Sequence, residues 1–173
     1  MWYKKYENKL GVRRKSFKKI ISLIEERNPR TLVETGTTRK VGNWAGDGCY
    51  TIIFAEYCKI SDSQLWTCDI MKESLELCKK LTTEYKENIE YVVSDSIEFL
   101  KEYDGQIDLL YLDSMTAAKG NNNKAQLHNL NEFKMGENKL HNNSTVIPKP
   151  VPICMIFPSL GMSSFGKIFF EII

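Results

Sequence analysis

Apolar residues occur along the chain in short runs that alternate with segments of helical periodicity. The first helical segment has an apolar face with the spacing i, i+3, i+4 and i+7, formed by Phe17, Ile20, Ile21 and Ile24. Ser16 is a suitable cap for this helix, and Asn28-Pro29 ends it. The pattern therefore predicts a first amphipathic helix whose apolar face packs on a core.

After this helix the pattern predicts strands and helices in alternation. Short apolar runs predict strands at Thr31–Glu34, Leu65–Asp69, Ile89–Val93, Ile107–Leu112 and, more weakly, Ser144–Ile147. Helical patterns between them cover Tyr50–Lys59, Met71–Lys86, Ser96–Tyr103 and Ala125–Leu140. Because the strands are apolar without strict alternation, both faces of the sheet are expected to be buried. The order predicts an α/β fold with a doubly wound, mostly parallel sheet.

The two ends of the chain differ from this middle part. Residues 1–15 are basic and aromatic and are expected to form a solvated arm or lid edge. Four of the five prolines lie between residues 148 and 158, where charged residues also become rare. Such proline density predicts an irregular tail with short strands at most, at Ile153–Phe157 and Lys167–Ile172. The predicted organisation is an arm (1–15), a domain (16–147) and a tail (148–173), with the C-terminal strands incomplete.

Composition excludes several classes of protein. Apolar residues make up 42% and charged residues 27% of the chain, as in folded soluble domains. The net charge of +2 is too small to indicate a nucleic-acid partner. No run of 18 apolar residues predicts a membrane span, and the N-terminus does not resemble a secretory signal. The five cysteines are odd in number and lack the spacing of a zinc or redox pair, which favours reduced thiols in the cytoplasm.

Acidic residues follow the first four predicted strands, at Glu34, Asp69, Asp95 and Asp113. In a doubly wound sheet, ligands bind at the carboxyl ends of the strands. A row of carboxylates along that edge favours a pocket for hydroxyls and amines. Asp69 is placed to bridge the two hydroxyls of a ribose. Glu34 would repel a phosphate and suits a cationic amine.

The glycines after the first strand exclude two common nucleotide sites. Their positions are Gly36, Gly42, Gly46 and Gly48. This spacing does not form the G-x-G-x-x-G sequence of a nicotinamide site, and no phosphate-binding G-x-x-x-x-G-K-[ST] loop occurs. A nicotinamide oxidoreductase and a nucleoside triphosphatase are therefore disfavoured.

Together these segments resemble the class I S-adenosylmethionine-dependent methyltransferases, and in particular a subgroup of small O-methyltransferase-like domains. Leu32–Thr37 is similar to their first motif and Asp69 to their ribose-binding acid. Asp95-Ser96 is similar to the adenine-side pair, and Ile107–Asp113 to the fourth-strand motif. The loop Gly42–Gly48 is longer than usual. The resemblance covers roughly residues 30–147.

The resemblance implies a sheet of order 3-2-1-4-5 with S-adenosyl-L-methionine as the cofactor. It implies that Glu34 and the backbone of Gly36 and Thr37 hold the methionine end, and that Asp69 binds the ribose. Asp113 would face the methyl acceptor, with His128 as a second candidate catalytic residue. The implied cofactor-binding set is Glu34, Thr35, Gly36, Thr37, Asp69, Ile70, Asp95 and Ser96.

Two departures from the family pattern limit what the resemblance implies. The chain runs from Ile147 into the proline-rich tail, where the family has another helix and an antiparallel strand pair. Some relatives bind a divalent metal through acids at and after the position of Asp113. Here Asp113 and His128 provide too few oxygen ligands for a magnesium site, so no metal is expected.

Purely structural roles stay open for several of these residues. Asp69 has the place of a helix cap, and Asp95 forms a capping box with Glu98. Glu34 could cap a loop amide, and His128 has the place of an ordinary helix residue.

The sequence predicts a methyltransferase that acts on a hydroxyl or amine of a small molecule. The alternative is a catalytically impaired, cofactor-binding remnant or an interaction protein with the same fold, which the altered C-terminal end favours. The sequence does not indicate an oligomeric state.

Overall fold

A computed structural model describes residues 1–46, 49–115, 122–148 and 169–170 of the chain. Its strands are β1 (Thr31–Thr35), β2 (Gln64–Asp69), β3 (Ile89–Val93), β4 (Ile107–Leu112), β5 (Leu140–Pro148) and β6 (Phe169–Phe170). Its α-helices are α1 (Lys4–Glu7), α2 (Arg14–Arg27), α3 (Tyr50–Ser61), α4 (Lys72–Leu81), α5 (Ser96–Glu102) and α6 (Asn122–Gly136). Shorter 3-10 helices are η1 (Gly11–Arg13), η2 (Thr83–Asn88) and η3 (Glu137–Lys139).

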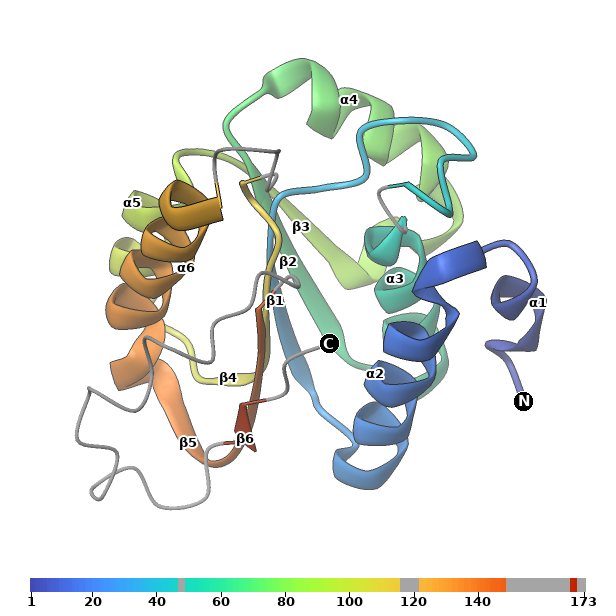
Figure 1. Ribbon diagram of the computed structural model, residues 1–173, viewed down its shortest axis with the longest axis horizontal. Helices are drawn as coiled ribbons and strands as arrows, with labels where there is room; N and C mark the ends of the chain where they lie inside the picture. Colours follow the sequence, from blue (N-terminus) through green and yellow to red (C-terminus); the bar gives the residue numbers. More distant parts are fainter. Residues whose placement is uncertain (47–48, 116–121, 149–168, 171–173) are drawn as a thin grey trace.

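The strands form one parallel sheet in the order β3-β2-β1-β4-β5-β6 (Figure 1). The first five strands have the order 3-2-1-4-5, so the predicted doubly wound, Rossmann-like fold is confirmed. β6 pairs in parallel with β5 and lies within one of the two tail segments expected to form a strand. The other such segment, Ile153–Phe157, lies outside the described residues.

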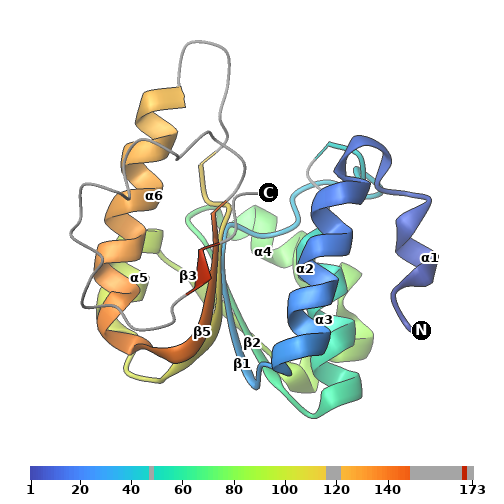
Figure 2. The ribbon, with the colours of Figure 1, turned by 60° about the horizontal axis from the view of Figure 1, so that its bottom comes forward.

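Helices cover both faces of the sheet (Figure 2). Successive residues of a central strand contribute to different apolar clusters, as expected when both faces are buried. Leu32 of β1 and Leu109 of β4 pack with the residues of α2 and α3, whereas the following residues, Val33 and Leu110, pack with those of α5 and α6. The chain therefore builds its core as two layers on one sheet.

The segment of residues 1–15, expected to be a solvated arm or lid edge, has two buried side chains that pack on the domain. Tyr6 is 3% exposed and Leu10 is fully buried. The Tyr6 ring lies 5.2 Å from that of Trp44, and the Arg13 side chain donates a 2.6 Å hydrogen bond to the Gly46 carbonyl. These aromatic and guanidinium contacts attach residues 1–13 to the loop after β1. The domain boundaries at residues 15 and 147 stay predictions.

Helix α2 also begins earlier than expected. Residues 11–13 form η1, which continues directly into α2 at Arg14. Ser16 is therefore inside the helix and does not cap it. The predicted apolar face is buried as expected, and the left-handed Asn28 ends the helix.

The predicted helix over Met71–Lys86 is divided into α4 and η2. Thr82 follows the last residue of α4, and its hydroxyl donates to the Cys78 carbonyl at 2.7 Å. The hydroxyl of Thr83 bonds the Lys79 carbonyl at 3.0 Å. Because these hydroxyls occupy the last carbonyls of the helix, they favour its termination there.

Helix α6 ends, and β5 begins, before the predicted positions. α6 ends at Gly136, and β5 already pairs with β4 at Leu140. The register shifts between Ile107 and Leu109, so β5 contains extra residues at this point. Ser144 bridges the irregularity, because its hydroxyl accepts from the His141 amide at 2.8 Å and donates to the Ile107 carbonyl at 2.6 Å.

Asp108 on β4 connects neighbouring strands at the amino edge of the sheet. Its carboxylate accepts from the backbone amides of Arg30 and Thr31 at 2.7 and 2.8 Å, and lies 2.6 Å from His141 Nε2. Burial opposes ionisation of Asp108, but the hydrogen bonds from His141, Thr31 and Arg30 outweigh it and lower its pKa. This carboxylate therefore connects the starts of β1, β4 and β5.

We predict that Asp108→Asn lowers the free energy of unfolding at pH 6 by about 1–3 kcal/mol, because two backbone amides and His141 lose a charged acceptor. A lowered pKa stabilises the fold above the unfolded-state pKa, and this contribution is lost as the pH falls through the folded-state pKa. The difference between wild type and variant should therefore shrink at pH 3 in urea titrations. Asp104→Asn, at an exposed site, is the control. An equal difference at both pH values would contradict this account.

Candidate functional site

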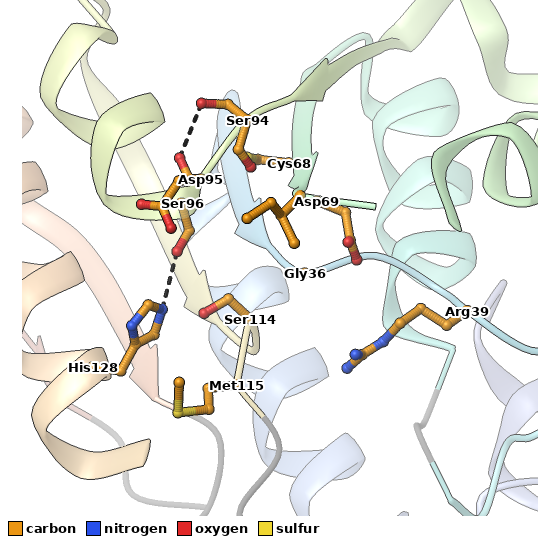
Figure 3. Close-up of a pocket in the computed structure, with 11 residues that line it drawn as sticks. Gly36, Arg39, Cys68, Asp69, Ser94, Asp95, Ser96, Ser114, Met115 and His128 are labelled. Atoms are coloured by element: carbon orange, nitrogen blue, oxygen red, sulfur yellow. Dashed lines mark hydrogen bonds between the residues drawn. The ribbon is translucent and has the colours of Figure 1, made fainter. Parts of the chain in front are cut away.

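A cavity of about 380 Å³ opens at the carboxyl edge of the sheet (Figure 3). Its walls come from the segments that directly follow β1, β2, β3 and β4, together with α6. The lining residues are Gly36, Arg39, Cys68, Asp69, Ile70, Ser94, Asp95, Ser96, Ser114, Met115 and His128. The cavity thus brings together Gly36, Asp69, Ile70, Asp95, Ser96 and His128 of the residues predicted from the sequence.

Gly36 allows the chain to leave β1 close to the end of β4. Its φ is +82°, and an added Cβ would lie 2.5 Å from the carbonyl oxygen of Asp113. The Gly36 amide donates to the Cys68 carbonyl at 2.7 Å, and the Asp113 amide donates to the Thr35 carbonyl at 2.9 Å. Only glycine fits this conformation and this close approach without strain. The turn carries the loop after β1 along one wall of the cavity.

Asp69 lies at the end of β2, is 8% exposed and lines the cavity. One carboxylate oxygen accepts from the Met71 amide at 2.8 Å, and the other accepts from the Thr37 amide at 3.3 Å. The structural role is therefore present, as a turn before α4, although Asp69 is not the cap residue of that helix. Each oxygen keeps acceptor capacity for a ligand hydroxyl. Beside it, Ile70 is 69% exposed at the cavity.

Asp95 and Ser96 form the wall at the start of α5. The Asp95 carboxylate caps this helix, accepting from the Ile97 and Glu98 amides at 2.9 and 3.3 Å. The cap holds the first turn of α5 in place, so the Ser96 hydroxyl lies 3.1 Å from His128 Nε2 (Figure 3). Asp95 thus has the expected structural role and a place on the cavity wall.

His128 reaches the cavity from α6. Its Nε2 lies 3.5 Å from the carboxylate of Glu132, four residues later on the same helix. The hydrogen bond with Glu132 raises the pKa of His128, and the negative charges of Glu132 and Asp95 add to this, while burial acts in the opposite direction. His128 therefore lies between a hydroxyl and a buried carboxylate.

Glu34 and Asp113 do not line the cavity but a narrow hollow beside it. Thr37 also lines this hollow, and Gly36 and Arg39 border both spaces. The hollow has a volume of about 10 Å³, room for about one water molecule. Thr35 lines neither space; its side chain and carbonyl oxygen accept from the Asp113 amide. The expected row of acids is thus split between two adjacent spaces.

Burial changes the charge of this hollow. Glu34 is 2% exposed and accepts from the Thr67 hydroxyl at 3.0 Å. Burial raises the pKa of Glu34 from 4.5 to about 8, with smaller upward contributions from Asp113 and Asp69 and downward ones from Thr51 and Thr67. At neutral pH Glu34 is therefore largely protonated.

Several residues of the site were not predicted from the sequence, notably Arg39, Met115, Cys68 and Glu132. Arg39 brings a cation to a cavity that was expected to be acidic. Its position three residues after Gly36, in the glycine loop, was the available signal. Glu132 could have been recognised by its i,i+4 spacing from His128, which places both on one helix face.

The described residues contain neither a group of three or more potential metal-ligating side chains of the His, Cys, Asp and Glu types nor a helix that fits a membrane span. Asp113 and His128, which were considered as metal ligands, are among the described residues and are not part of such a group. None of the helices α1 to α6 is long and apolar enough to cross a membrane.

No family model and no curated protein matches this sequence. Solved structures do match its fold. A putative O-methyltransferase from Klebsiella pneumoniae has a TM-score of 0.54 and 17% identity over 75% of this chain and 52% of its own. The S-adenosylhomocysteine-bound methyltransferase PaMTH1 from Podospora anserina has a TM-score of 0.50 and 15% identity, over 72% of this chain and 47% of its own.

A short-chain dehydrogenase/reductase from Serratia marcescens matches with a TM-score of 0.51 and 11% identity, over 79% of this chain and 61% of its own. This chain spans about half to three fifths of the length of these proteins. At such low identity the similarity establishes the fold alone. The chain has the Rossmann-like fold found in class I methyltransferases.

We predict that Gly36→Ala destabilises the protein by about 2 kcal/mol or more, because the new Cβ would be strained and would overlap the Asp113 backbone. Gly42→Ala is the matched control: Gly42 also has a positive φ, of +68°, but an added Cβ there has open space. Urea unfolding of both variants measures the difference. Equal losses at the two positions would show that the close approach of Gly36 to Asp113 is unimportant.

We predict that Glu34 makes stability depend on pH between 5 and 8. The pKa of Glu34 is higher in the folded state than in the unfolded state, so proton binding by Glu34 stabilises the fold at low pH. This contribution to the free energy of unfolding is lost as the pH rises through about 8. The wild type should therefore lose stability relative to Glu34→Gln between pH 5 and pH 8, in urea titrations. Glu90→Gln, at an exposed strand position, should follow the wild type. A pH-independent difference for Glu34→Gln would refute the raised pKa.

Proposed function

We propose that the protein is an S-adenosylmethionine-dependent methyltransferase that transfers a methyl group to a hydroxyl or amine of a small molecule. One observation carries this proposal: segments following four parallel strands converge on a single cavity, in a sheet whose first five strands have the order 3-2-1-4-5. Cavities at this edge are where folds of this type bind nucleoside ligands. The volume of about 380 Å³ is in the range of small-molecule sites.

In this proposal the cofactor lies across the wall formed by β1 to β3. Asp69 binds the ribose hydroxyls, with Ile70 against the adenine and with Asp95 and Ser96 beside it. Gly36 lets the backbone approach the methionine part closely. The Arg39 guanidinium, at the boundary between cavity and hollow, is suited to the methionine carboxylate. Glu34, Thr35 and Thr37 then support the loop from behind.

Methyl transfer requires mainly that the protein position the methyl donor and the acceptor. The sulfonium donor is already activated, so transfer is an in-line displacement that depends on holding donor and nucleophile at close range. His128, Ser114 and Met115 line the cavity on the α6 side, where an acceptor would enter. Asp113, which is set in the hollow, acts in this account on the loop and not directly on the acceptor.

A second candidate is a cofactor-binding protein without transfer activity. The observation that favours it is the position of Asp113, the expected catalytic acid, in a hollow with room for about one water molecule. This candidate predicts binding of S-adenosylhomocysteine without transfer from labelled S-adenosylmethionine to any member of a pool of cell metabolites.

The buried thiols of Cys58, Cys68 and Cys78 support our further proposal that the protein works in the reducing cytoplasm.

We predict that S-adenosylhomocysteine binds in isothermal titration calorimetry and that Asp69→Asn weakens binding at least tenfold. The charged acceptor for the ribose hydroxyls is lost, which corresponds to about 1.4 kcal/mol. Asp104→Asn should bind like the wild type, and equal melting temperatures would show that the fold is intact.

NADH is the comparison ligand in the same experiment, because the structure of a short-chain dehydrogenase/reductase is also similar. Binding of NADH but not of S-adenosylhomocysteine would contradict the proposal. Failure of both ligands to bind would contradict it as well. Binding unaffected by Asp69→Asn would place the ligand elsewhere.

A further inference from the structure

Helix α6 buries a carboxylate next to the cavity. Glu132 is fully buried, and one of its oxygens accepts a 2.6 Å hydrogen bond from the Ser114 hydroxyl. The other oxygen, Oε2, is buried without a hydrogen-bond partner among the described residues. A buried carboxylate costs several kcal/mol unless it is paired, so this position calls for a compensating interaction.

His128 is the cationic partner available to Glu132. The two lie on one face of α6, at i and i+4, with 3.5 Å between His128 Nε2 and Glu132 Oε1. Ser96 Oγ approaches the same nitrogen at 3.1 Å. In a nucleophile–histidine–acid triad the serine and the acid contact different ring nitrogens, so this cluster is not one. Within the described part of the chain no hydrogen bond reaches Nδ1, the second ring nitrogen.

Charged groups around His128 come from several elements. Glu132 is on α6 and Asp95 is at the start of α5, and both raise the pKa of the ring. Arg39 and Asp69 line the same cavity from the loops after β1 and β2. The exposed Lys124 lies one turn earlier on α6. Of these charged groups, Glu132 is the one whose carboxylate contacts the ring, at 3.5 Å from Nε2.

We propose that Glu132 is a positioning residue that holds the His128 ring at the cavity wall and stabilises its protonated form, so that His128 accepts the proton of a hydroxyl acceptor. The proposal rests on the proposed function, and it selects hydroxyl acceptors that must lose a proton to react. Ser114 fixes the carboxylate, and Glu132 fixes Nε2–H, which leaves Nδ1 as the basic nitrogen.

The step is balanced in atoms and charge. The imidazole takes the proton of the acceptor hydroxyl as the oxygen attacks the methyl carbon. The carbon–sulfur bond breaks, and its electron pair stays on sulfur, which gives neutral S-adenosylhomocysteine. The positive charge of the sulfonium is thereby replaced by that of the imidazolium, which Glu132 stabilises. The proton then passes to solvent.

Nuclear magnetic resonance of the two histidines of the chain, His128 and His141, tests the role of Glu132 without any substrate. In wild type the pKa of His128 should lie above 6.5, with Nε2 carrying the proton in the neutral ring. Glu132→Gln should lower that pKa by about one unit or more, since an opposite charge at this range is lost. Glu76→Gln, at an exposed helix position with a lysine partner, should leave it unchanged.

A His128 pKa at or below 6.5 in wild type, or one that Glu132→Gln leaves unchanged, would overturn the proposal. If Glu132→Gln does not fold, the wild-type pKa and tautomer still decide, and Glu132→Asp, which keeps the charge on a shorter side chain, provides a second variant. Because Glu132→Asp keeps the negative charge, the pKa of His128 should stay above that of Glu132→Gln, and equal pKa values in the two variants would also oppose the proposal.

Addition of S-adenosylhomocysteine separates this proposal from the proposed function. The ligand should shift the His128 signals, because the ring lines the cavity, and leave those of His141 unchanged, because His141 lies at the amino edge of the sheet. Calorimetric binding with unmoved His128 signals would refute the proposal alone. No calorimetric binding would refute the proposed function, whereas the pKa comparison would still decide whether Glu132 controls His128.

Discussion

The site depends on the close approach of two backbone segments at the carboxyl edge of the sheet. Gly36 leaves β1 in a left-handed conformation, against the carbonyl group of Asp113 that ends β4. Hydrogen bonds from Gly36 to β2 and from Asp113 to β1 fix this crossing. From this crossing, the segments after β1 and after β4 both continue along the cavity, which Gly36, Ser114 and Met115 line. A larger residue at position 36 would move both walls.

Desolvation then decides which of the strand-end acids can act on a ligand. Asp69 faces the cavity and keeps acceptor capacity there, although two backbone amides already bind it. Glu34 is buried next to the partly buried Asp113, and its raised pKa avoids a buried negative charge beside that carboxylate. The expected row of carboxylates is thus divided: Asp69 and Asp95 line the cavity, whereas Glu34 and Asp113 line the hollow. Arg39 further reduces the negative charge of the cavity, which suits a ligand that carries both a carboxylate and a cation.

The elements of the domain that local sequence determines were predicted well. β3 and β4 have the bounds that the apolar runs predict, and α3 and α5 begin at the expected residues. These segments carry a strong apolar pattern, so neighbours in space alter them little. The end of α4 depended on Thr82 bonding back to the helix, and the start of β5 depended on Ser144 bridging an irregular register. Such contacts are not visible in periodicity.

The site was predicted where it follows directly from strand ends, and missed where tertiary packing creates it. Asp69, Asp95 and Ser96 line the cavity because they end or follow parallel strands. Glu132 does not follow a strand, and its one sequence signal was the i,i+4 spacing from His128. Its burial could not be predicted, because a buried acid on a helix has the same local sequence pattern as a solvent-facing one. The packing of the N-terminal aromatic residues was likewise not predicted from the sequence: Tyr6 packs on Trp44, in the glycine-rich loop after β1.

The most direct test of the account is a crystal structure of the protein grown with S-adenosylhomocysteine. The account predicts that the adenosyl group occupies the cavity, with ribose hydroxyls bonded to Asp69 and the adenine between Ile70 and the start of α5. An empty cavity at saturating ligand, or a ligand bound away from Asp69, would contradict it.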